Sequence, residues 1–353
     1  MFKTLVKVSA QPLATANSAK NISATHLFFK HSTLLTKSLL TLTALVSSAS
    51  FAATRWDMAT PYVDATHHTQ NVIQFAKDVK QATKGELEIV VHSGASLIKH
   101  TEIARAVRTQ QVTIGEVFIG ILGNSDPIYK LDNIPFLATN FEQAKALYAA
   151  SKSTLEKKLD KDGMMLLYSV PWPPQGIYSK APIKTIDDLK GGKMRAYSPT
   201  LSRLSVLLGA TPTTVQTVEI PQAFSTGIID MMITSPTTGV SSQAWDYLSN
   251  YTDVQAWIPK NMVIVNKRAF KRLPKEVQGE LLAMADKAEK RGWEMAEKET
   301  VEKTKALSDN GITVAKPSAE LMSSLKKVGD VMAKEWADEA GAEGKAVLDA
   351  YHP

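Results

Sequence analysis

The sequence predicts an α/β fold in two parts that are joined through a short irregular segment. Strand-like and helix-like patterns alternate over residues 56–121, which is typical of a largely parallel sheet covered by helices. A proline-rich stretch at 171–176 interrupts the pattern, and a second set of strands and helices occupies about 179–260. We interpret the interruption as a crossing between two domains, with ligands expected at the carboxyl ends of the strands.

The first set of elements begins with a short strand pattern over 56–60. A helix is expected over about 69–83, because apolar residues recur there on one face. Alternating apolar residues predict a half-buried strand at 87–91, and residues 103–107 continue as a second helix. An unbroken apolar run at 117–121 predicts a buried strand.

The second half of the chain repeats these patterns and ends in a long helix. Residues 164–170 predict one more strand before the interruption, and 226–230 has a strand-like pattern closed by turn residues. Residues 263–265 are expected to be extended again. Residues 274–307 keep a helical pattern well beyond the average length of about 12 residues. The residues alone favour coiled-coil or ordinary core packing for this helix.

One arginine stands near the start of a predicted strand. Residues 187–195 read Asp-Asp-Leu-Lys-Gly-Gly-Lys-Met-Arg. The paired glycines allow a tight reversal, so the chain can enter an extended segment that carries Arg195. Because loop-to-strand junctions are where proteins usually meet ligands, Arg195 is the best functional clue in the sequence.

Several short motifs follow one another in a fixed order. They are Thr-Lys-Gly-Glu-Leu-Glu-Ile at 83–89, Ile-Pro-Phe-Leu at 134–137, the glycine turn with Arg195, Leu-Gly-Ala at 208–210, Glu219, Gly-Ile-Ile-Asp at 227–230, and Leu-Pro-Lys-Glu-Val-Gln at 273–278. In this order the chain resembles the solute-binding proteins of tripartite ATP-independent periplasmic (TRAP) transporters. The resemblance extends from about residue 55 to the C-terminus.

The resemblance implies a class II periplasmic-binding-protein fold, in which two α/β domains enclose a ligand cleft and a long helix spans both. Domain I is expected at 53–176 with parts of about 262–310. Domain II is expected at 177–261 with parts of the C-terminal helices. The helix at 274–307 would then lie along both domains, and the resemblance implies no cofactor.

Residues 1–52 are interpreted as a cleaved secretion signal. The segment contains five lysines and no acidic residue, and an apolar run at 39–46 leads into small residues. Ser50 and Ala52 supply the small side chains that signal peptidase requires, so we expect a cut after Ala52 and a periplasmic mature chain. The apolar run is shorter than the roughly 20 residues of a membrane span. The mature chain is therefore expected not to span the membrane, with a retained N-terminal anchor as the alternative.

Charge, cysteine content and motifs exclude several classes of protein. The formal net charge of +6 falls to about +1 without the five lysines of the leader, and no basic face with interleaved aromatic residues indicates nucleic acid. The chain has no cysteine, which excludes disulfides and thiolate metal sites.

His67 and His68 are interpreted as solvated residues at a helix start, because no third ligand follows at zinc spacing. Since motifs of common hydrolases and phosphate-binding enzymes are absent, neither an enzyme nor a metal site is predicted.

The resemblance assigns Arg195 to the ligand carboxylate. A guanidinium group makes two parallel charge-assisted hydrogen bonds and stays protonated in a dry cleft; an interdomain or surface salt bridge is the alternative for an arbitrary arginine. Gln175 stands close to where several family members have a second arginine. Its neutral amide puts dicarboxylates and sialic-acid-like ligands in doubt and favours a monocarboxylate. Gln175 could equally be a loop residue without ligand contact.

Two aromatic residues are candidates for the pocket wall. Trp172 lies in a Pro-Trp-Pro-Pro segment, which is stiff because prolines fix the backbone. Tyr197 should face the same side as Arg195, because side chains alternate along a strand. Core packing explains both aromatic residues nearly as well. Glu219 is expected to cap or pair near a helix rather than touch the solute.

The remaining pocket candidates come from the family pattern. Thr234 and Ser235 stand where the family usually has an asparagine, and a hydroxyl could replace the amide donor. Phe118, at the end of a first-domain strand, corresponds to another pocket position. So does His100 in the preceding loop, or its neighbour Lys99.

Together these features predict a periplasmic subunit that captures a small organic acid without chemical change. Arg195 would hold the carboxylate, the domains would close by a hinge, and a separate TRAP permease would receive the ligand. A monocarboxylate is preferred; aromatic, 2-oxo and branched aliphatic acids all fit. The chain is expected to be a monomer. The alternatives are a ligand-presenting subunit for a sensor kinase, a binding protein for an ATP-driven importer, and a periplasmic enzyme.

Overall fold

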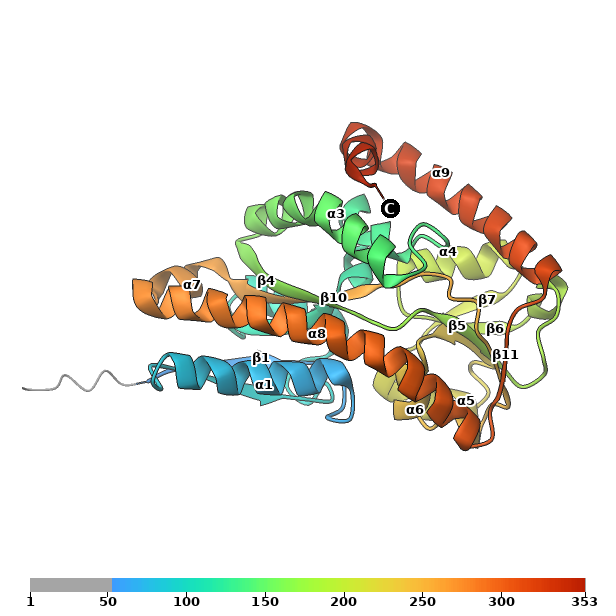
Figure 1. Ribbon diagram of the computed structural model, residues 1–353, viewed down its shortest axis with the longest axis horizontal. Helices are drawn as coiled ribbons and strands as arrows, with labels where there is room; N and C mark the ends of the chain where they lie inside the picture. The colour runs from blue at the N-terminus through green and yellow to red at the C-terminus, as the bar shows by residue number, and fades with distance from the viewer. Residues whose placement is uncertain (1–52, 353) are drawn as a thin grey trace, which may run out of the picture. The chain divides into compact units, whose positions relative to one another are not determined.

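The computed structural model describes residues 53–352, which form two β-sheets covered by helices (Figure 1). The predicted secretion signal at 1–52, with its cut after Ala52, lies outside the described residues. Within the described part of the chain, no helix is both long enough and apolar enough to cross a membrane.

The eleven strands of residues 53–352 are divided between the two sheets. The first sheet contains β1 (Thr54–Ala59), β2 (Leu87–His92), β3 (Ile114–Phe118), β4 (Met164–Pro171) and β10 (Lys260–Asn266). Their order is β2-β1-β3-β10-β4. The second sheet contains β5 (Gly176–Ser179), β6 (Lys193–Ala196), β7 (Thr211–Thr214), β8 (Met231–Thr234), β9 (Asn250–Thr252) and β11 (Thr313–Ala315). Their order is β11-β9-β5-β8-β6-β7.

Each sheet has one strand that runs against all the others. β10 is antiparallel to β3 and β4, and β5 is antiparallel to β8 and β9, whereas the other pairs are parallel. These are the strands through which the chain enters one sheet directly from the other. The strands β1, β2 and β3 of residues 56–121 are parallel to one another, as expected, and the one reversed strand in each sheet makes both sheets mixed. Alternation of strands and helices does not reveal the direction of a crossover strand.

Helices accompany both sheets. Near the first sheet are α1 (His67–Ala82), α2 (Ile103–Arg108), α3 (Phe141–Lys161) and α7 (Lys267–Arg272). The helices between strands of the second sheet are α4 (Pro199–Leu207), α5 (Ile220–Ser225) and α6 (Pro236–Ser241), and α9 (Ala319–Ala350) ends the chain. The apolar face predicted for the first helix is buried, since Val72, Phe75 and Val79 are at most 1% exposed.

The long helix α8 (Lys275–Asp309) lies along elements of both sheets (Figure 1). It contacts α1 and β4, which flank or belong to the first sheet, and α6 and β11, which flank or belong to the second. Val277, Leu281 and Ala285 join the apolar core of the first sheet, so the periodic apolar face of α8 is core packing. Two α/β sheets with long C-terminal helices confirm the predicted fold class. The division into domains at residues 176 and 177 stays a prediction.

Two segments predicted as strand are turns. Ile119–Leu122 forms a 3-10 turn directly after β3, where a β-carbon on Gly120 would lie 2.6 Å from the Asn133 amide nitrogen. Residues 226–230 form the turn that follows α5, and β8 starts only at Met231. Gly227 has a φ of +69°, a left-handed conformation that ends a helix and does not continue as a strand.

Candidate functional site

Residues that follow strands of both sheets line one cavity. The first sheet contributes residues that follow β1 and β2 and the end of β3, and the second sheet contributes residues of or after β6, β7 and β8. The cavity holds about 350 Å³ of space without protein atoms, part of it open to solvent. It is lined by Tyr62, His100, Phe118, Trp172, Gln175, Arg195, Tyr197, Gln216, Thr217, Thr234, Ser235, Thr238 and Pro259.

All eight residues that the sequence identified as ligand-binding are among these lining residues. Lys99, the alternative to His100, is not. The sequence analysis missed Tyr62, Gln216, Thr217, Thr238 and Pro259. Three of them follow the strands β1 and β7, so the rule that ligands meet the carboxyl ends of strands could have found them. The contact of each residue with a ligand stays a prediction.

Arg195 is the charged group of the cavity. It lies on β6 and is only 2% exposed. Its Nε donates to the Val215 carbonyl at 3.0 Å, and its Nη2 donates to the Thr217 hydroxyl at 3.4 Å. No carboxylate of residues 53–352 lies within ion-pair distance of it. Burial lowers the pKa of Arg195 to about 10, so the group stays protonated at neutral pH and its charge is available to an anion.

Gln175 and Tyr197 are fixed by one another beside this arginine. The Gln175 amide nitrogen donates to the Pro173 carbonyl at 2.8 Å, and its oxygen accepts from the Tyr197 hydroxyl at 3.0 Å. The guanidinium carbon of Arg195 lies 4.9 Å from the centre of the Tyr197 ring, a cation–π contact. Tyr197 and Arg195 thus share one side, as the alternation along the strand predicts. Gln175 stands close to where several family members have a second arginine, so Arg195 is the one guanidinium among the described lining residues.

Aromatic rings form the apolar part of the wall. Tyr62, Phe118 and Trp172 make one buried cluster, in which the Tyr62 and Trp172 rings meet edge to face with centres 4.9 Å apart. Phe118, at the end of the first sheet's β3, meets Tyr197 of the second sheet edge to face at 5.3 Å. Rings from both sheets therefore contact each other at the cavity.

His100 links the first sheet to the second. Its Nε2 accepts from the Phe118 backbone N–H at 3.2 Å, so its Nδ1 carries the proton and donates to the Gln216 side-chain oxygen at 3.1 Å. Burial lowers the pKa of His100 to about 4, which keeps the ring neutral. Because both ring nitrogens are used within the protein, His100 contributes its ring surface to the cavity rather than a hydrogen bond.

Two buried histidines predict that the protein loses stability as the pH falls from about 6.5 to 4.5. Burial lowers the pKa of His68 and of His100 to about 4, whereas the ordinary value of 6.5 holds after unfolding, so in this window only the unfolded chain takes up the protons. Between pH 6.5 and 4.5, each histidine should lower the free energy of unfolding by about 2 kcal/mol. Urea denaturation at the two pH values measures this. A His100→Gln variant should show a shallower slope, and a wild-type stability that is flat or rises toward pH 4.5 would contradict the account.

The hydroxyl groups of Ser235 and Thr234 beside the cavity have different roles. Ser235 is the N-cap of α6, and its Oγ accepts from the Thr238 backbone N–H at 3.1 Å. Its hydroxyl is therefore largely committed to the helix, whereas Thr234 at the end of β8 only lines the cavity. Glu219 accepts from the Gln216 backbone N–H at 2.8 Å, which confirms that it caps a short helical turn.

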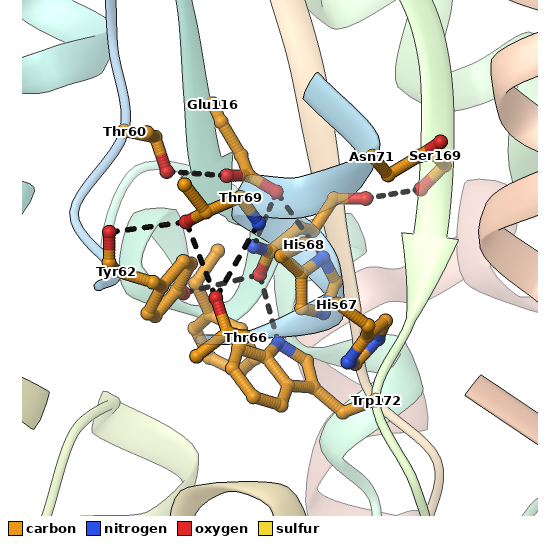
Figure 2. Close-up of polar contacts among 12 residues, drawn as sticks. Thr60, Tyr62, Thr66, His67, His68, Thr69, Asn71, Glu116, Ser169 and Trp172 are labelled. Atoms are coloured by element: carbon orange, nitrogen blue, oxygen red, sulfur yellow. Dashed lines mark hydrogen bonds and ion pairs between the residues drawn. The ribbon is translucent and has the colours of Figure 1, made fainter. Parts of the chain in front are cut away.

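The histidines predicted as solvated are buried, and their rings pack against Trp172 of the cavity wall (Figure 2). His67 and His68 are both 0% exposed. His67 Nε2 lies 3.0 Å from the Pro171 carbonyl oxygen, and His68 Nδ1 lies 3.1 Å from Oε1 of Glu116. The prediction is wrong because these partners are distant in the sequence and follow no periodic pattern. Among residues 53–352, no three metal-ligating side chains come together.

Glu116 is a buried carboxylate in the same region (Figure 2). It lies on β3 and is 1% exposed. Its Oε2 accepts from the Thr60 hydroxyl at 2.5 Å, and its Oε1 accepts from the Asn261 amide at 3.0 Å. Burial raises the pKa of Glu116, but hydrogen bonds from His68, Asn261 and Thr60 outweigh burial and hold the pKa below its ordinary value. Glu116 is therefore ionised at neutral pH.

Comparison with protein families gives one match that spans most of the chain. Residues 59–339 match the model of the bacterial extracellular solute-binding proteins, family 7. These residues include every residue that lines the cavity. The match therefore covers the site and every strand except β1, of which it includes only Ala59.

Three solved structures are similar to the chain over almost their whole length. The Bordetella pertussis extracytoplasmic solute receptor DctP7, which binds pyroglutamic acid, is 50% identical, with 85% of this chain and 99% of the receptor covered and a TM-score of 0.84. DctP6 of the same organism also binds pyroglutamic acid and is 45% identical, with 84% and 99% covered and a TM-score of 0.84. A marine-metagenome TRAP solute-binding protein specific for pyroglutamate, from an unidentified microbe, is 35% identical, with 85% and 99% covered and a TM-score of 0.84.

Proposed function

The chain belongs to family 7 of the bacterial extracellular solute-binding proteins as a TRAP extracytoplasmic receptor, and on this premise we propose that it captures a small monocarboxylic acid of the pyroglutamate type. The resemblance seen in the sequence is thereby confirmed. Proteins of this family bind solutes and do not transform them, which confirms the prediction that the chain is not an enzyme. The identity of the acid belongs to the proposal.

One observation carries the proposal: a buried, protonated guanidinium faces the cavity without a protein carboxylate within ion-pair distance among residues 53–352. A buried charge without a partner is costly, so Arg195 favours an anion that brings one negative charge. The other polar lining groups are amides, hydroxyls and a neutral histidine. One fixed positive charge fits one carboxylate, and a second carboxylate would be buried without a cation.

The chemistry of the cavity wall agrees with a small ring-bearing acid. The rings of Tyr62, Phe118 and Trp172 offer flat apolar surface opposite the polar groups. Three similar receptors, at 35–50% identity, bind pyroglutamate or pyroglutamic acid, a compact five-membered lactam with one carboxylate.

The proposed action is capture by closure of the two sheets over the acid. His100 and Phe118 of the first sheet already contact Gln216 and Tyr197 of the second, and such contacts exist only when the sheets are close together. A ligand that touches both sides favours this state, because it binds the closed form better than the open one. The closed form would then dock on a separate TRAP permease.

We also propose that the mature chain begins at Ala53, which N-terminal sequencing of the exported protein tests.

Titration calorimetry with two acids of similar length tests the proposed ligand class. Pyroglutamate should bind with a Kd in the micromolar range or below, about 8 kcal/mol or more of binding free energy. Glutarate, which carries a second carboxylate in place of the lactam, should bind at least about tenfold more weakly, because that charge has no cation to meet. Equal or tighter binding of glutarate, or no binding of pyroglutamate, would overturn the proposal.

A further inference from the structure

We propose that Glu116 and Asn261, which lie behind the cavity, fix the hydrogen-bond polarity of its wall, so that Tyr62 presents an acceptor and the ligand must bring an N–H donor. The inference rests on the proposed function and narrows its substrate class. Neither Glu116 nor Asn261 lines the cavity. Both act through Tyr62 and are positioning residues.

The orientation of the Asn261 amide follows from two partners that each have a single role. The Trp172 indole can only donate, and it donates to Asn261 Oδ1 at 2.9 Å. The Glu116 carboxylate can only accept, and it accepts from Asn261 Nδ2 at 3.0 Å. If the amide were flipped, its N–H group would face the indole N–H of Trp172, donor against donor. Its oxygen would face the Glu116 carboxylate, acceptor against acceptor. Asn261 therefore turns its oxygen toward the aromatic wall.

Glu116 is itself held in place. Thr60 donates to its Oε2, and His68 lies beside its Oε1 (Figure 2). The carboxylate is 1% exposed, so water does not compete for its oxygens. Hydrogen bonds that outweigh burial keep the pKa of Glu116 below its ordinary value, and the group remains an acceptor at neutral pH.

The Tyr62 hydroxyl donates its only proton to Asn261 Oδ1, at 3.2 Å. Burial raises the pKa of Tyr62 well above its ordinary value, so the proton is not lost. If the proton turned into the cavity, the Tyr62 and Asn261 oxygens would face each other as two acceptors. The Tyr62 oxygen therefore has a lone pair and no proton to offer to a ligand in the cavity that Tyr62 lines.

The backbone of Tyr62 cannot easily move away from this arrangement. Its carbonyl oxygen accepts from the Gly94 backbone N–H at 2.8 Å and from the Thr69 hydroxyl at 3.0 Å. Its ring packs against Trp172 at 4.9 Å and against His100 at 5.5 Å between ring centres. The acceptor thus has a fixed place in the wall.

A fixed acceptor in a cavity with one guanidinium selects among monocarboxylates. A lactam or an amide next to the carboxylate supplies the N–H that Tyr62 accepts. A 2-oxo acid, a branched aliphatic acid or an aromatic acid without a donor leaves the Tyr62 oxygen unpaired, and such mismatches are strongly disfavoured in buried sites. These acids, which the sequence left open, are expected to bind more weakly.

The test compares pyroglutamate with 3-oxocyclopentanecarboxylate, in which a CH₂ group replaces the ring N–H. Titration calorimetry on the wild-type protein should give an affinity ratio of at least about ten in favour of the lactam, the factor that one hydrogen bond supplies. Tyr62→Phe should weaken the lactam and leave the carbocycle nearly unchanged, so that the ratio falls to within about threefold. Glu116→Gln, which removes the acceptor-only partner of Asn261, should lower the ratio as well.

Tyr168→Phe is the matched control. Tyr168 is buried and belongs to the core of the first sheet, its hydroxyl has no hydrogen-bond partner among the described residues, and it does not line the cavity. This variant should keep the wild-type ratio. Equal binding of both acids to the wild type, or a wild-type ratio in Tyr62→Phe, overturns the inference and leaves the proposed function standing. Failure of pyroglutamate to bind at all overturns the proposed function and the inference with it.

Discussion

Replacing Arg195 with glutamine is expected to lower the affinity for pyroglutamate at least about a hundredfold. Hydrogen bonds to charged groups contribute about 1.5–3 kcal/mol each, and a guanidinium can make two to one carboxylate. Their loss therefore corresponds to about two orders of magnitude or more in Kd. Calorimetric titration of the purified variant measures the change. An affinity within about threefold of the wild type would show that Arg195 does not hold the carboxylate.

The same substitution should leave the fold intact. Arg195 is 2% exposed and has no carboxylate partner within ion-pair distance in the described part of the chain, so its removal relieves a buried charge and breaks only the bonds to Val215 and Thr217. The unliganded variant is expected to melt near the wild-type temperature or above it. Arg203→Gln serves as the control, because Arg203 pairs with Glu335 at the surface and does not line the cavity. It should bind as the wild type does.

Replacing Lys260 with methionine is expected to destabilise the protein by about 3–5 kcal/mol at neutral pH. Lys260 opens the crossover strand β10, and its Nζ lies 3.1 Å from Oδ2 of Asp132. The two side chains are only 3% and 5% exposed. Burial raises the pKa of Asp132 although Lys260 lowers it, so loss of the lysine leaves a carboxyl group that must bury a charge or take up a proton. Urea denaturation measures the loss.

A second variant separates the effect of the Lys260–Asp132 ion pair on stability from the effect of side-chain packing around it. Lys260→Met combined with Asp132→Asn removes both charges, and most of the lost stability should return because no unpaired charge remains. Lys334→Met is the surface control: Lys334 pairs with Asp338, but the two side chains are 77% and 68% exposed, so no measurable change is expected. A Lys260→Met variant as stable as the wild type, or a double variant no better than the single one, would contradict this account.

The fold was predictable from local patterns, but the direction of the crossover strands was not. Apolar periodicity correctly placed α8 and the helix α1, because a core-facing stripe is a local property of the sequence. The reversal of β5 and β10 depends on which sheet the chain enters next. That is a long-range property, and the order of strands and helices carries no trace of it.

The candidate site, too, was predictable where the signal is local and not where it depends on partners far away in the sequence. Arg195 could be found because a glycine turn and an ordered set of motifs surround it. His67 and His68 were misjudged because their partners, Pro171 and Glu116, are far away along the chain. The position of Tyr62 after β1 could have marked it as a lining residue, but its hydrogen bond to Asn261 depends on the crossover strand β10 and leaves no sign in the local sequence.

A crystal structure of the mature chain grown with pyroglutamate would show directly whether Arg195 holds the carboxylate. We expect the acid in the cavity between the two sheets, with both carboxylate oxygens within hydrogen-bond distance of the Arg195 guanidinium and its ring N–H directed at the Tyr62 oxygen. An acid bound with its carboxylate on other groups, or an Arg195 side chain turned out of the cavity, would contradict it.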